Sequence, residues 1–337
     1  MKSRFSSSLL VIFTILFTLY SCGAPYETQT LFAMDTVVTV SAEAHSPDDL
    51  AAAAETLAAI ENTFSRTRED AEIAVVNTRT ESTLSSETEQ LLAKALEVSK
   101  NTGGAFSPTL GRLTSLWNVT GGGYVPTDEE LAAALADCRM QDVSITDGTV
   151  SKPAGLQFDL GACVKGYAAE KAIEALKDKG IRNAMINIGG NVAVSGKPQK
   201  AAYWRIGVKN PFYPDELLGY ITANDGVIAV SGTYERFFEK DGVIYHHIFD
   251  PATGFPAASG LKEAAVYAKD GFLADALSTA LFVMGEERAS AFYESGVYAF
   301  EAILVTDDGR VVVTAGLKER FVPNADAAFD DTRKLIF

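Results

Sequence analysis

Apolar residues in this chain occur in runs of two kinds: Ala-rich runs that begin behind polar caps, and short β-branched runs that end at turns. Runs of the first kind begin at polar caps. Pro47 follows Ser46 and would occupy a first helical position, and Ser86 and Thr127 each begin a capping box. Glycines mark where such runs stop. Helices are therefore predicted from Pro47 to about Phe64, from Glu87 to Gly103, from Asp128 onwards and from Lys165 to Lys179.

The β-branched runs are separated by turn signals. Asp147-Gly148, Asp241-Gly242 and Asp308-Gly309 each stand between two such runs, which predicts three hairpins. Residues 184–188 are typical of a buried strand, and residues 31–40 are rich in β-formers. Further strands are expected at residues 203–208, 219–223, 227–231, 244–249, 262–268 and 297–305. Helices that alternate with hairpins predict an α+β fold with mixed or antiparallel sheets and packed helices rather than a doubly wound parallel sheet.

The N-terminal residues have the order of charged and apolar residues found in export signals. Lys2 and Arg4 precede the apolar run of residues 9–19, which is too short for a membrane span of about 20 residues and is typical of a signal peptide. The run leads to Cys22 in a sequence that resembles a bacterial lipobox. Residues 1–21 are therefore predicted to be a lipoprotein signal peptide, with a lipid on Cys22. Ordinary signal cleavage nearby, with Cys22 incidental, is the alternative.

This interpretation has consequences for location and domain organisation. A lipid on Cys22 would anchor the protein to a bacterial membrane, at its periplasmic or extracellular face. Residues 22–30 read as a short polar linker. No linker divides residues 31–337 convincingly, so these residues are expected to form one catalytic unit with two lobes.

Composition and charge narrow the function classes. The chain has 337 residues, of which 47% are hydrophobic and 10% aromatic, so it is long and apolar enough for a substantial core. Its 44 acidic and 29 basic side chains give a net charge of −15, which argues against nucleic acid as a partner. An anionic ligand would have to be held by local backbone N–H groups, a few lysines or a metal. Three cysteines are too few for a disulfide framework.

Three glycine-containing segments are candidates for ligand contact. The Gly103–Gly111 segment follows a helix and can bring backbone N–H groups to a ligand, although a helix C-cap with a loop explains it as well. Small residues in Asp159–Tyr167 open the 165–179 helix, where Lys165 would add a positive charge at an anion site; the alternative is a strand-to-helix turn that Asp159 caps. The Asn187–Asn191 segment is either a simple turn or bare backbone on which a flat ring or a ribityl chain could lie.

A fourth segment carries oxygen ligands. Asp275 and Thr279 are four residues apart in an apolar helix, so they share one face. A carboxylate and a hydroxyl are hard ligands that suit magnesium. The alternative is a hydrogen bond between Asp275 and Thr279 at a helix surface, but apolar neighbours make an unpaired carboxylate costly and favour a bound cation.

The chain has three histidines, and only one is expected to take part in chemistry. His45 precedes a helix cap and is expected to lie in solvent. His246 and His247 are expected on one strand, where their side chains would point to opposite faces. No His/Cys spacing predicts a zinc centre, and no GxSxG elbow or Cys/His pair predicts an acyl-enzyme.

Six motifs, in this order, resemble those of the ApbE family, the FAD:protein FMN transferases, over nearly all of residues 30–320. Each motif is weak alone, but six in register are specific. The motifs are Met34-Asp35-Thr36 (family MGT), Gly104–Gly111 (GAFDPTxG), Asp159–Tyr167 (DLGGxAKGY), Asn187–Gly190 (NxGG), Ser231-Gly232 followed by His247–Gly254 (SG…HIxDPxTG), and Asp275–Ala280 (DALxTA).

The resemblance implies an ApbE-like fold related to the T-fold, and a magnesium-dependent reaction. Such enzymes transfer FMN from FAD to a Thr or Ser hydroxyl of an acceptor subunit in a membrane redox complex or another exported flavoprotein, and AMP leaves. By position in the motifs, magnesium would be bound by the Ala162 carbonyl with Asp275 and Thr279. FAD would be held by Met34, Ala105, Phe106, Ser107, Asp159, Lys165, His247 and Ile248.

The catalytic residues would then be Asp275, through the metal, and His247, which is the best candidate for a general base because an imidazole titrates near neutral pH. Asp35 and Ser107 depart from the family pattern, and Thr67 stands where many members have a Tyr that contacts FAD. Two other functions stay open. One is an FAD pyrophosphatase that uses water in place of the acceptor hydroxyl, and the other is a non-catalytic FAD-binding lipoprotein, against which the intact pair of Asp275 and Thr279 argues.

Overall fold

The computed structural model describes residues 26–324 and 335–336, and a nine-stranded sheet is its centre. Neighbouring strands of this sheet are antiparallel except for the last pair, β15 and β17. The strands, in spatial order, are β1 (Tyr26–Ala33), β2 (Thr36–Glu43), β6 (Ala184–Ile188), β7 (Asn191–Ser195), β10 (Asp225–Gly232), β13 (Leu261–Ala268), β14 (Glu301–Thr306), β15 (Val311–Val313) and β17 (Leu335–Ile336). The predicted α+β fold with mixed sheets is confirmed.

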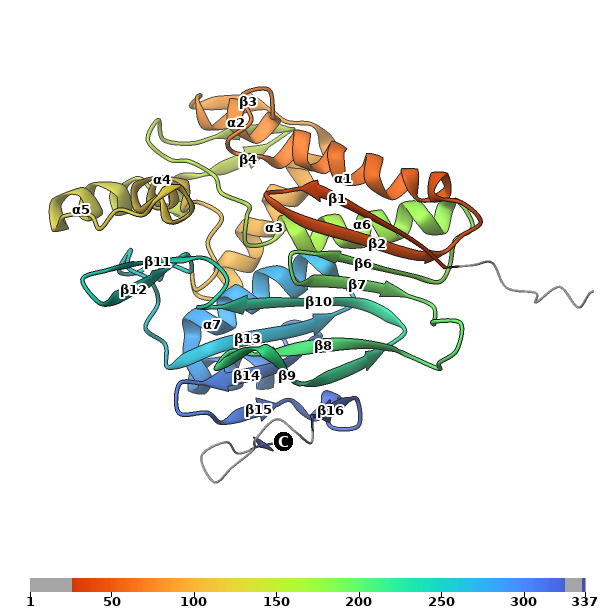
Figure 1. Cartoon of the computed structure of the whole chain (residues 1–337). Helices are drawn as coiled ribbons and strands as arrows, with labels where there is room; N and C mark the ends of the chain where they lie inside the picture. Colours follow the sequence, from red (N-terminus) through yellow and green to blue (C-terminus); the bar gives the residue numbers. More distant parts are fainter. Residues whose placement is uncertain (1–25, 325–334, 337) are drawn as a thin grey trace, which may run out of the picture.

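Helices cover one face of this sheet, and the main hydrophobic core lies between them. The helices are α1 (Ala51–Phe64), α3 (Ser86–Asn101), α6 (Val164–Asp178) and α7 (Gly271–Glu294). Figure 1 shows α6 and α7 behind the sheet. Leu57, Ala168 and Leu277 from three of the helices are fully buried together with Val40 and Ile186 of the sheet. In the part of the chain that the structure describes, no helix has both the length and the apolar character needed to cross a membrane.

A second, smaller sheet covers the opposite face. It consists of β8 (Trp204–Asn210), β9 (Tyr213–Ala223) and β16 (Phe321–Pro323), and Figure 1 shows β8 and β9 in front of the large sheet. Along β13, Ala264 and Val266 face the helical core, whereas Ala265 and Tyr267 face the second sheet. Because both faces of the central strands are buried, these strands appear in the sequence as continuous apolar runs rather than as alternating ones.

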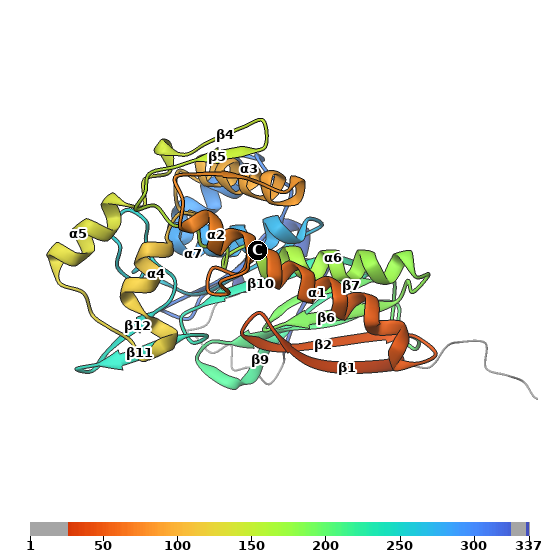
Figure 2. The same ribbon diagram turned by 90° about the horizontal axis from the view of Figure 1, so that it is seen from above.

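A separate hydrophobic cluster forms around Trp117 at one end of the molecule. The Trp117 indole donates a hydrogen bond to the Gly254 carbonyl at 2.8 Å and packs on Tyr245 and Phe249. Figures 1 and 2 show the elements that build this Trp117 cluster together at the same end. They are α4 (Gly111–Trp117), α5 (Asp128–Ala136), and the hairpin of β11 (Phe237–Lys240) and β12 (Val243–His246).

Short elements complete the described chain. They are the helix α2 (Glu72–Asn77), the sheet of β3 (Glu81–Thr83), β4 (Ser144–Thr146) and β5 (Thr149–Ser151), and the 3₁₀ helices η1 (Pro47–Leu50), η2 (Val119–Gly121), η3 (Met140–Asp142) and η4 (Ala315–Leu317). The predicted turns at Asp147 and Asp241 are confirmed as hairpin ends between β4 and β5 and between β11 and β12.

Some sequence-based boundaries were wrong. Residues 31–40 are not one run, because Met34 and Asp35, with φ of 54° and 58°, form a tight turn between β1 and β2. β1 begins at Tyr26, so the expected 22–30 linker overlaps a strand that pairs residue by residue with β2. The expected 244–249 strand ends at His246. The proposed signal peptide and Cys22 lie outside the described residues.

The crossing of α6 and α7 is unusually close, and two glycines make it possible. A Cβ atom on Gly166 would lie 2.1 Å from the Gly271 carbonyl oxygen, and one on Gly271 would lie 2.2 Å from the Gly166 oxygen. Both helices are anchored at this point, since Glu170 of α6 accepts a hydrogen bond from the Gly271 N–H at 2.7 Å. The first turns of the two helices therefore lie against each other.

The close contact between Gly166 and Gly271 predicts that one added methyl group destabilises the fold. In Gly166→Ala the added atom would meet backbone that cannot move aside, so we expect the free energy of unfolding to fall by about 1–3 kcal/mol, as in other overpacked cores. Urea unfolding followed by circular dichroism measures this. Glu174→Ala, at an exposed position of the same helix, should change stability by less than about 0.5 kcal/mol. Equal stabilities of the two variants would contradict the prediction.

Candidate functional site

The side chain of Asp275 lies where the N-terminal ends of α6 and α7 meet. It is 3% exposed. The Gly166 N–H donates to its Oδ2 at 2.9 Å, and the Asn191 side-chain amide donates to its Oδ1 at 2.8 Å. The carboxylate is therefore not unpaired even without a cation, because a helix N-terminus and an amide satisfy it. The alternative of an Asp275–Thr279 hydrogen bond at a helix surface was wrong, since Asp275 is buried and the Thr279 hydroxyl bonds Ser231 at 3.1 Å.

The three oxygen groups predicted to bind magnesium are of a kind that suits it, and they lie on two segments that the Gly166–Asp275 hydrogen bond joins. Thr279 is half-buried one turn after Asp275, and Ala162 is half-buried in the turn before α6. The first backbone hydrogen bond within α6 runs from the Tyr167 N–H to the Cys163 carbonyl. The Ala162 carbonyl precedes it and takes no part in the backbone hydrogen bonds of the helix. One carboxylate and two neutral oxygens leave room for the waters and phosphates that Mg²⁺ retains. In the described ranges no three His, Cys, Asp or Glu side chains gather in a way that could hold a metal ion.

The thiol near this site is not reactive. Cys163 is fully buried, and burial, followed by the negative charge of Asp275, raises the pKa of its thiol well above the usual value. Thiolate chemistry at Cys163 is therefore disfavoured at neutral pH.

Lys165, at the start of α6, is close enough to His247 for its charge to act on the imidazole. Lys165 is the second residue of α6, where the positive end of the helix dipole favours an anion. The Nδ1 atom of His247 is 3.2 Å from the Arg236 carbonyl oxygen, which can only accept. Nδ1 therefore carries the proton, and Nε2 keeps a free lone pair.

The surroundings of His247 keep its imidazole neutral. Burial, followed by the positive charge of Lys165, lowers the pKa of His247 to about 4. The imidazole is thus uncharged at neutral pH. Negative phosphates placed beside it would raise this pKa towards the range of a useful base.

His246 has different surroundings. Its Nε2 lies 3.2 Å from the Ala257 carbonyl oxygen, its Nδ1 accepts the Ile248 N–H at 3.3 Å, and its ring packs edge-on against Phe282. Burial lowers the pKa of His246 as well. His246 is a core residue at the end of β12, while His247 follows the strand. Ile248 is also buried, so its side chain belongs to the main core.

Asp159 connects two of the glycine-containing segments. Its carboxylate accepts the Gly161 N–H at 2.9 Å and pairs with Arg66 at 3.3 Å, and its own N–H donates to the Pro108 carbonyl at 2.8 Å. Thr67, which follows Arg66, is exposed. The turn before Pro108 is thereby held beside the start of the Asp159 segment.

The residues predicted in that turn differ in what they can offer a ligand. Phe106 is fully buried and packs edge-on against Phe272, in the first turn of α7, with ring centroids 6.4 Å apart. Its side chain is part of the core, so only its backbone could face FAD. Ala105 is also buried. Ser107 is half-buried, and its hydroxyl lies 3.0 Å from that of Thr109.

Two hairpin ends place the remaining segments at the same edge of the sheet. The Met34–Asp35 turn joins β1 to β2, and the Gly189–Gly190 turn joins β6 to β7. A Cβ atom on Gly189 would lie 2.5 Å from the Thr36 hydroxyl oxygen, so the two turns are in close contact. Asn191 directly follows the second turn and reaches Asp275. The structure thus connects the Met34 turn, through Asn191, to the starts of α6 and α7.

Sequence reasoning missed Asn191 and Ser231 as site residues. Both are buried polar residues at the ends of apolar strands, and both contact the Asp275–Thr279 turn of α7. The available signal was their position within the motifs Asn187–Asn191 and Ser231-Gly232. Their partners were not visible, because these lie 84 and 48 residues away in sequence.

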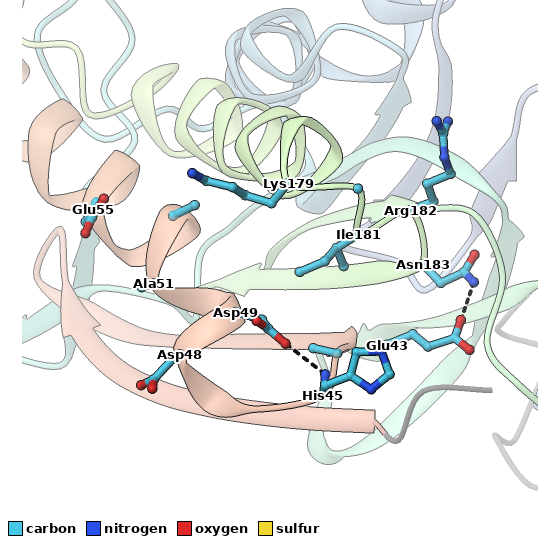
Figure 3. A pocket seen from close by; sticks show the side chains of 13 residues that line it. Glu43, His45, Asp48, Asp49, Ala51, Glu55, Lys179, Ile181, Arg182 and Asn183 are labelled. Atoms are coloured by element: carbon cyan, nitrogen blue, oxygen red, sulfur yellow. Dashed lines mark hydrogen bonds between the residues drawn. The ribbon is translucent and has the colours of Figure 1, made fainter. Parts of the chain in front are cut away.

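A cavity of about 770 Å³ lies at the far end of β2 and α6 and contains none of these residues. Figure 3 shows its wall, where Glu43 bonds Asn183 and the His45 N–H bonds Asp49. Charges of both signs, including Lys179, line this cavity and are open to solvent. None of the residues predicted for FAD or magnesium lines this cavity.

The low pKa of His247 gives stability a pH dependence. An imidazole in the unfolded chain titrates near pH 6.5, whereas His247 in the fold titrates at about pH 4. Between these values the unfolded chain binds more protons, so the free energy of unfolding should fall as pH decreases from about 6.5 to about 4. Thermal unfolding at several pH values should show a shallower fall for His247→Gln. His45→Gln, which changes an exposed imidazole, should follow the wild type. Identical pH profiles for His247→Gln and the wild type would contradict this assignment.

Comparison with known proteins identifies relatives of this chain. The sequence profile of the ApbE family matches residues 34–304. The FAD:protein FMN transferase of Treponema pallidum is 34% identical over 313 residues, which cover 82% of this chain and 84% of that protein. The protein of the same name from Klebsiella pneumoniae is 35% identical over 239 residues, which cover 69% of this chain and 73% of that protein.

Solved structures agree with the fold. The ApbE protein of Thermotoga maritima has a TM-score of 0.81 and 33% identity, and the match covers 88% of this chain and 99% of that one. The flavin transferase ApbE from Vibrio cholerae has a TM-score of 0.78 and 30% identity, with 88% and 99% covered. The profile, the relatives and the shared fold lead to one conclusion: this chain belongs to the ApbE family.

Proposed function

We propose that this protein transfers FMN from FAD to a Thr or Ser hydroxyl of an acceptor flavoprotein subunit, in a magnesium-dependent reaction that releases AMP. Two links at the start of α6 carry the proposal: the Gly166 N–H donates to Asp275, one turn before Thr279 on α7, and the charge of the neighbouring Lys165 acts on His247. Family membership supports it, because relatives at 34% and 35% identity are named FAD:protein FMN transferases.

Different residues of this chain would bind the substrate and transfer the proton. Asp275, Thr279 and the Ala162 carbonyl would hold Mg²⁺, which when bound neutralises phosphate charge in the transfer. The side chain and the N–H group of Lys165, at the start of α6, would hold the phosphates of FAD. The Met34 turn, the backbone of Ala105, Phe106 and Ser107, the Asp159 segment and the His247–Ile248 segment would position the rest of FAD.

His247 would take the proton of the acceptor. A Thr hydroxyl is a weak nucleophile at neutral pH. As its oxygen forms a bond to the FMN phosphorus, the bond from phosphorus to the AMP oxygen breaks, and the proton moves to Nε2 of His247. The contact between Nδ1 and the Arg236 carbonyl supports this role, because it leaves Nε2 unprotonated.

The direct test combines the purified protein with FAD, MgCl₂ and a candidate acceptor subunit. The acceptor is then weighed by mass spectrometry, and the nucleotides are separated by chromatography. FMN attached to the acceptor, with one AMP released per FMN, would support the proposal. Free FMN and AMP beside an unmodified acceptor would support an FAD pyrophosphatase instead, and unchanged FAD would support a binding protein.

Asp275→Asn tests the metal ligand. This variant keeps the side-chain shape but removes the negative charge, so we expect the rate of transfer to fall by at least about 100-fold. Asp275→Ala is less informative, because it leaves the N–H groups of Gly166 and Asn191 unpaired and costs about 1–3 kcal/mol of stability. Thr279→Ala should reduce the rate less, since water can replace a neutral ligand. Wild-type activity of Asp275→Asn across a MgCl₂ titration would eliminate this site.

His247→Ala tests the base. If His247 takes the proton, kcat should fall by about 10²- to 10⁴-fold while the KM for FAD changes little. His246→Ala should lower the thermal unfolding temperature, because it unpairs the Ala257 carbonyl, and should leave kcat within a few-fold of wild type. A His247→Ala enzyme that binds FAD poorly but transfers FMN normally at saturation would make His247 a binding residue.

We further propose that a lipid on Cys22 anchors the protein to a bacterial membrane, where an exported or membrane-bound acceptor would meet it. The basic and apolar residues before Cys22 support this proposal. Cys22→Ser should move the protein from the membrane fraction to the soluble fraction after cell lysis. Equal membrane association of Cys22→Ser and wild type would contradict the anchor.

A further inference from the structure

Two strands of the large sheet send buried polar side chains to the turn of α7 that carries Asp275 and Thr279. Asn191 is the first residue of β7 and is 1% exposed, and Ser231, near the end of β10, is 8% exposed. The proposed function assigns no role to either residue. Each makes hydrogen bonds that determine how one of the proposed magnesium ligands is oriented.

The amide of Asn191 orients the carboxylate of Asp275. The Val230 N–H donates to Oδ1 of Asn191 at 3.4 Å, so the NH₂ group of the amide must face the other way. That NH₂ group donates to Oδ1 of Asp275 at 2.8 Å, while the Gly166 N–H donates to Oδ2 at 2.9 Å. Each carboxylate oxygen thus has one N–H donor and one lone pair left for a cation.

A chain of hydroxyl groups orients Thr279. The Ser278 hydroxyl donates to the Asp275 carbonyl at 2.8 Å. A hydroxyl has one hydrogen, so Ser278 must accept from Ser231, whose oxygen is 2.8 Å away. Ser231 has then used its own hydrogen and must accept from Thr279, at 3.1 Å. The hydrogen of Thr279 therefore points into the sheet, and its lone pairs point away from Ser231.

We propose that Asn191 and Ser231 are positioning residues that hold Asp275 and Thr279 in the orientation that binds Mg²⁺. They act through the ligands and do not touch the ion. This inference rests on the proposed magnesium site. Ligands held in place by buried partners lose little freedom when the ion binds, and removal of such partners typically lowers metal affinity by about 10- to 100-fold.

The test measures metal binding without turnover. Mn²⁺ is titrated into the detergent-solubilised full-length protein in the presence of ADP, which supplies a diphosphate without a flavin, and free Mn²⁺ is read by electron paramagnetic resonance. We expect Ser231→Ala and Asn191→Ala to weaken Mn²⁺ binding by about 10- to 100-fold. Ser231→Thr, which keeps the hydroxyl, should restore most of the affinity. Should Ser231→Ala fail to fold, Ser231→Cys keeps the size of the side chain and takes its place.

Matched controls separate positioning from general stability. Ser195 is a buried serine on β7 whose hydroxyl bonds the Arg182 carbonyl at the far end of the strand, and Asn210 is a fully buried asparagine on β8. Ser195→Ala should lower the unfolding temperature about as much as Ser231→Ala does, and both Ser195→Ala and Asn210→Ala should leave Mn²⁺ affinity unchanged. Wild-type Mn²⁺ affinity in both Ser231→Ala and Asn191→Ala would overturn the inference.

A different set of Mn²⁺ affinities is expected if the proposed magnesium site itself is wrong. Asp275→Asn should abolish Mn²⁺ binding. If the wild type bound no Mn²⁺, or bound it as tightly as Asp275→Asn, the proposed magnesium site would be wrong and this inference would fall with it. If Asp275→Asn loses Mn²⁺ binding but the Asn191 and Ser231 variants keep it, the magnesium site is retained and only the positioning role of Asn191 and Ser231 is rejected.

Discussion

The site depends on one close contact, the crossing of α6 and α7 at Gly166 and Gly271. Because neither residue has a Cβ atom, the two backbones approach closely enough for the first turn of α6 to reach Asp275, 109 residues further along the chain. The carboxylate caps the helix, and the helix supplies an N–H group and the positive end of its dipole to the carboxylate. The same contact thus stabilises the fold and orients the proposed ligand.

Burial determines the chemical character of this region. The chain is strongly acidic, so attraction for an anionic nucleotide has to be local. Lys165 and the start of α6 provide positive potential, and the same lysine, together with burial, keeps His247 neutral. Charges in such poorly solvated surroundings act more strongly on one another than exposed charges do. A proton acceptor and a fixed positive charge therefore stand side by side.

The nine-stranded sheet supports the residues that contact the Asp275–Thr279 turn. Both faces of its central strands are covered, one by helices and the other by β8 and β9, so most side chains there are apolar. Polar side chains that enter from the strand ends, Asn191 and Ser231, are consequently held by well-packed neighbours on every side. A buried polar group of this kind is stable only if its hydrogen bonds are made, and here they are made with Asp275 and Thr279 or their direct neighbours.

The sequence by itself determined what depends on local interactions. Caps and turn residues located α5 and the Asp-Gly hairpins, because a cap or a tight turn is satisfied within a few residues. They located α1 and α3 less closely, since residues 47–50 form the 3₁₀ helix η1 and the cap of α3 is Ser85 rather than Ser86. The motifs also indicated the family. Local patterns did not reveal that Phe106 and His246 belong to the core, or that Gly166 and Asn191 share the carboxylate of Asp275. Only the tertiary structure decided these points, because the partners lie 84 and 109 residues apart and meet through the packing of two helices and a sheet, which no local pattern encodes.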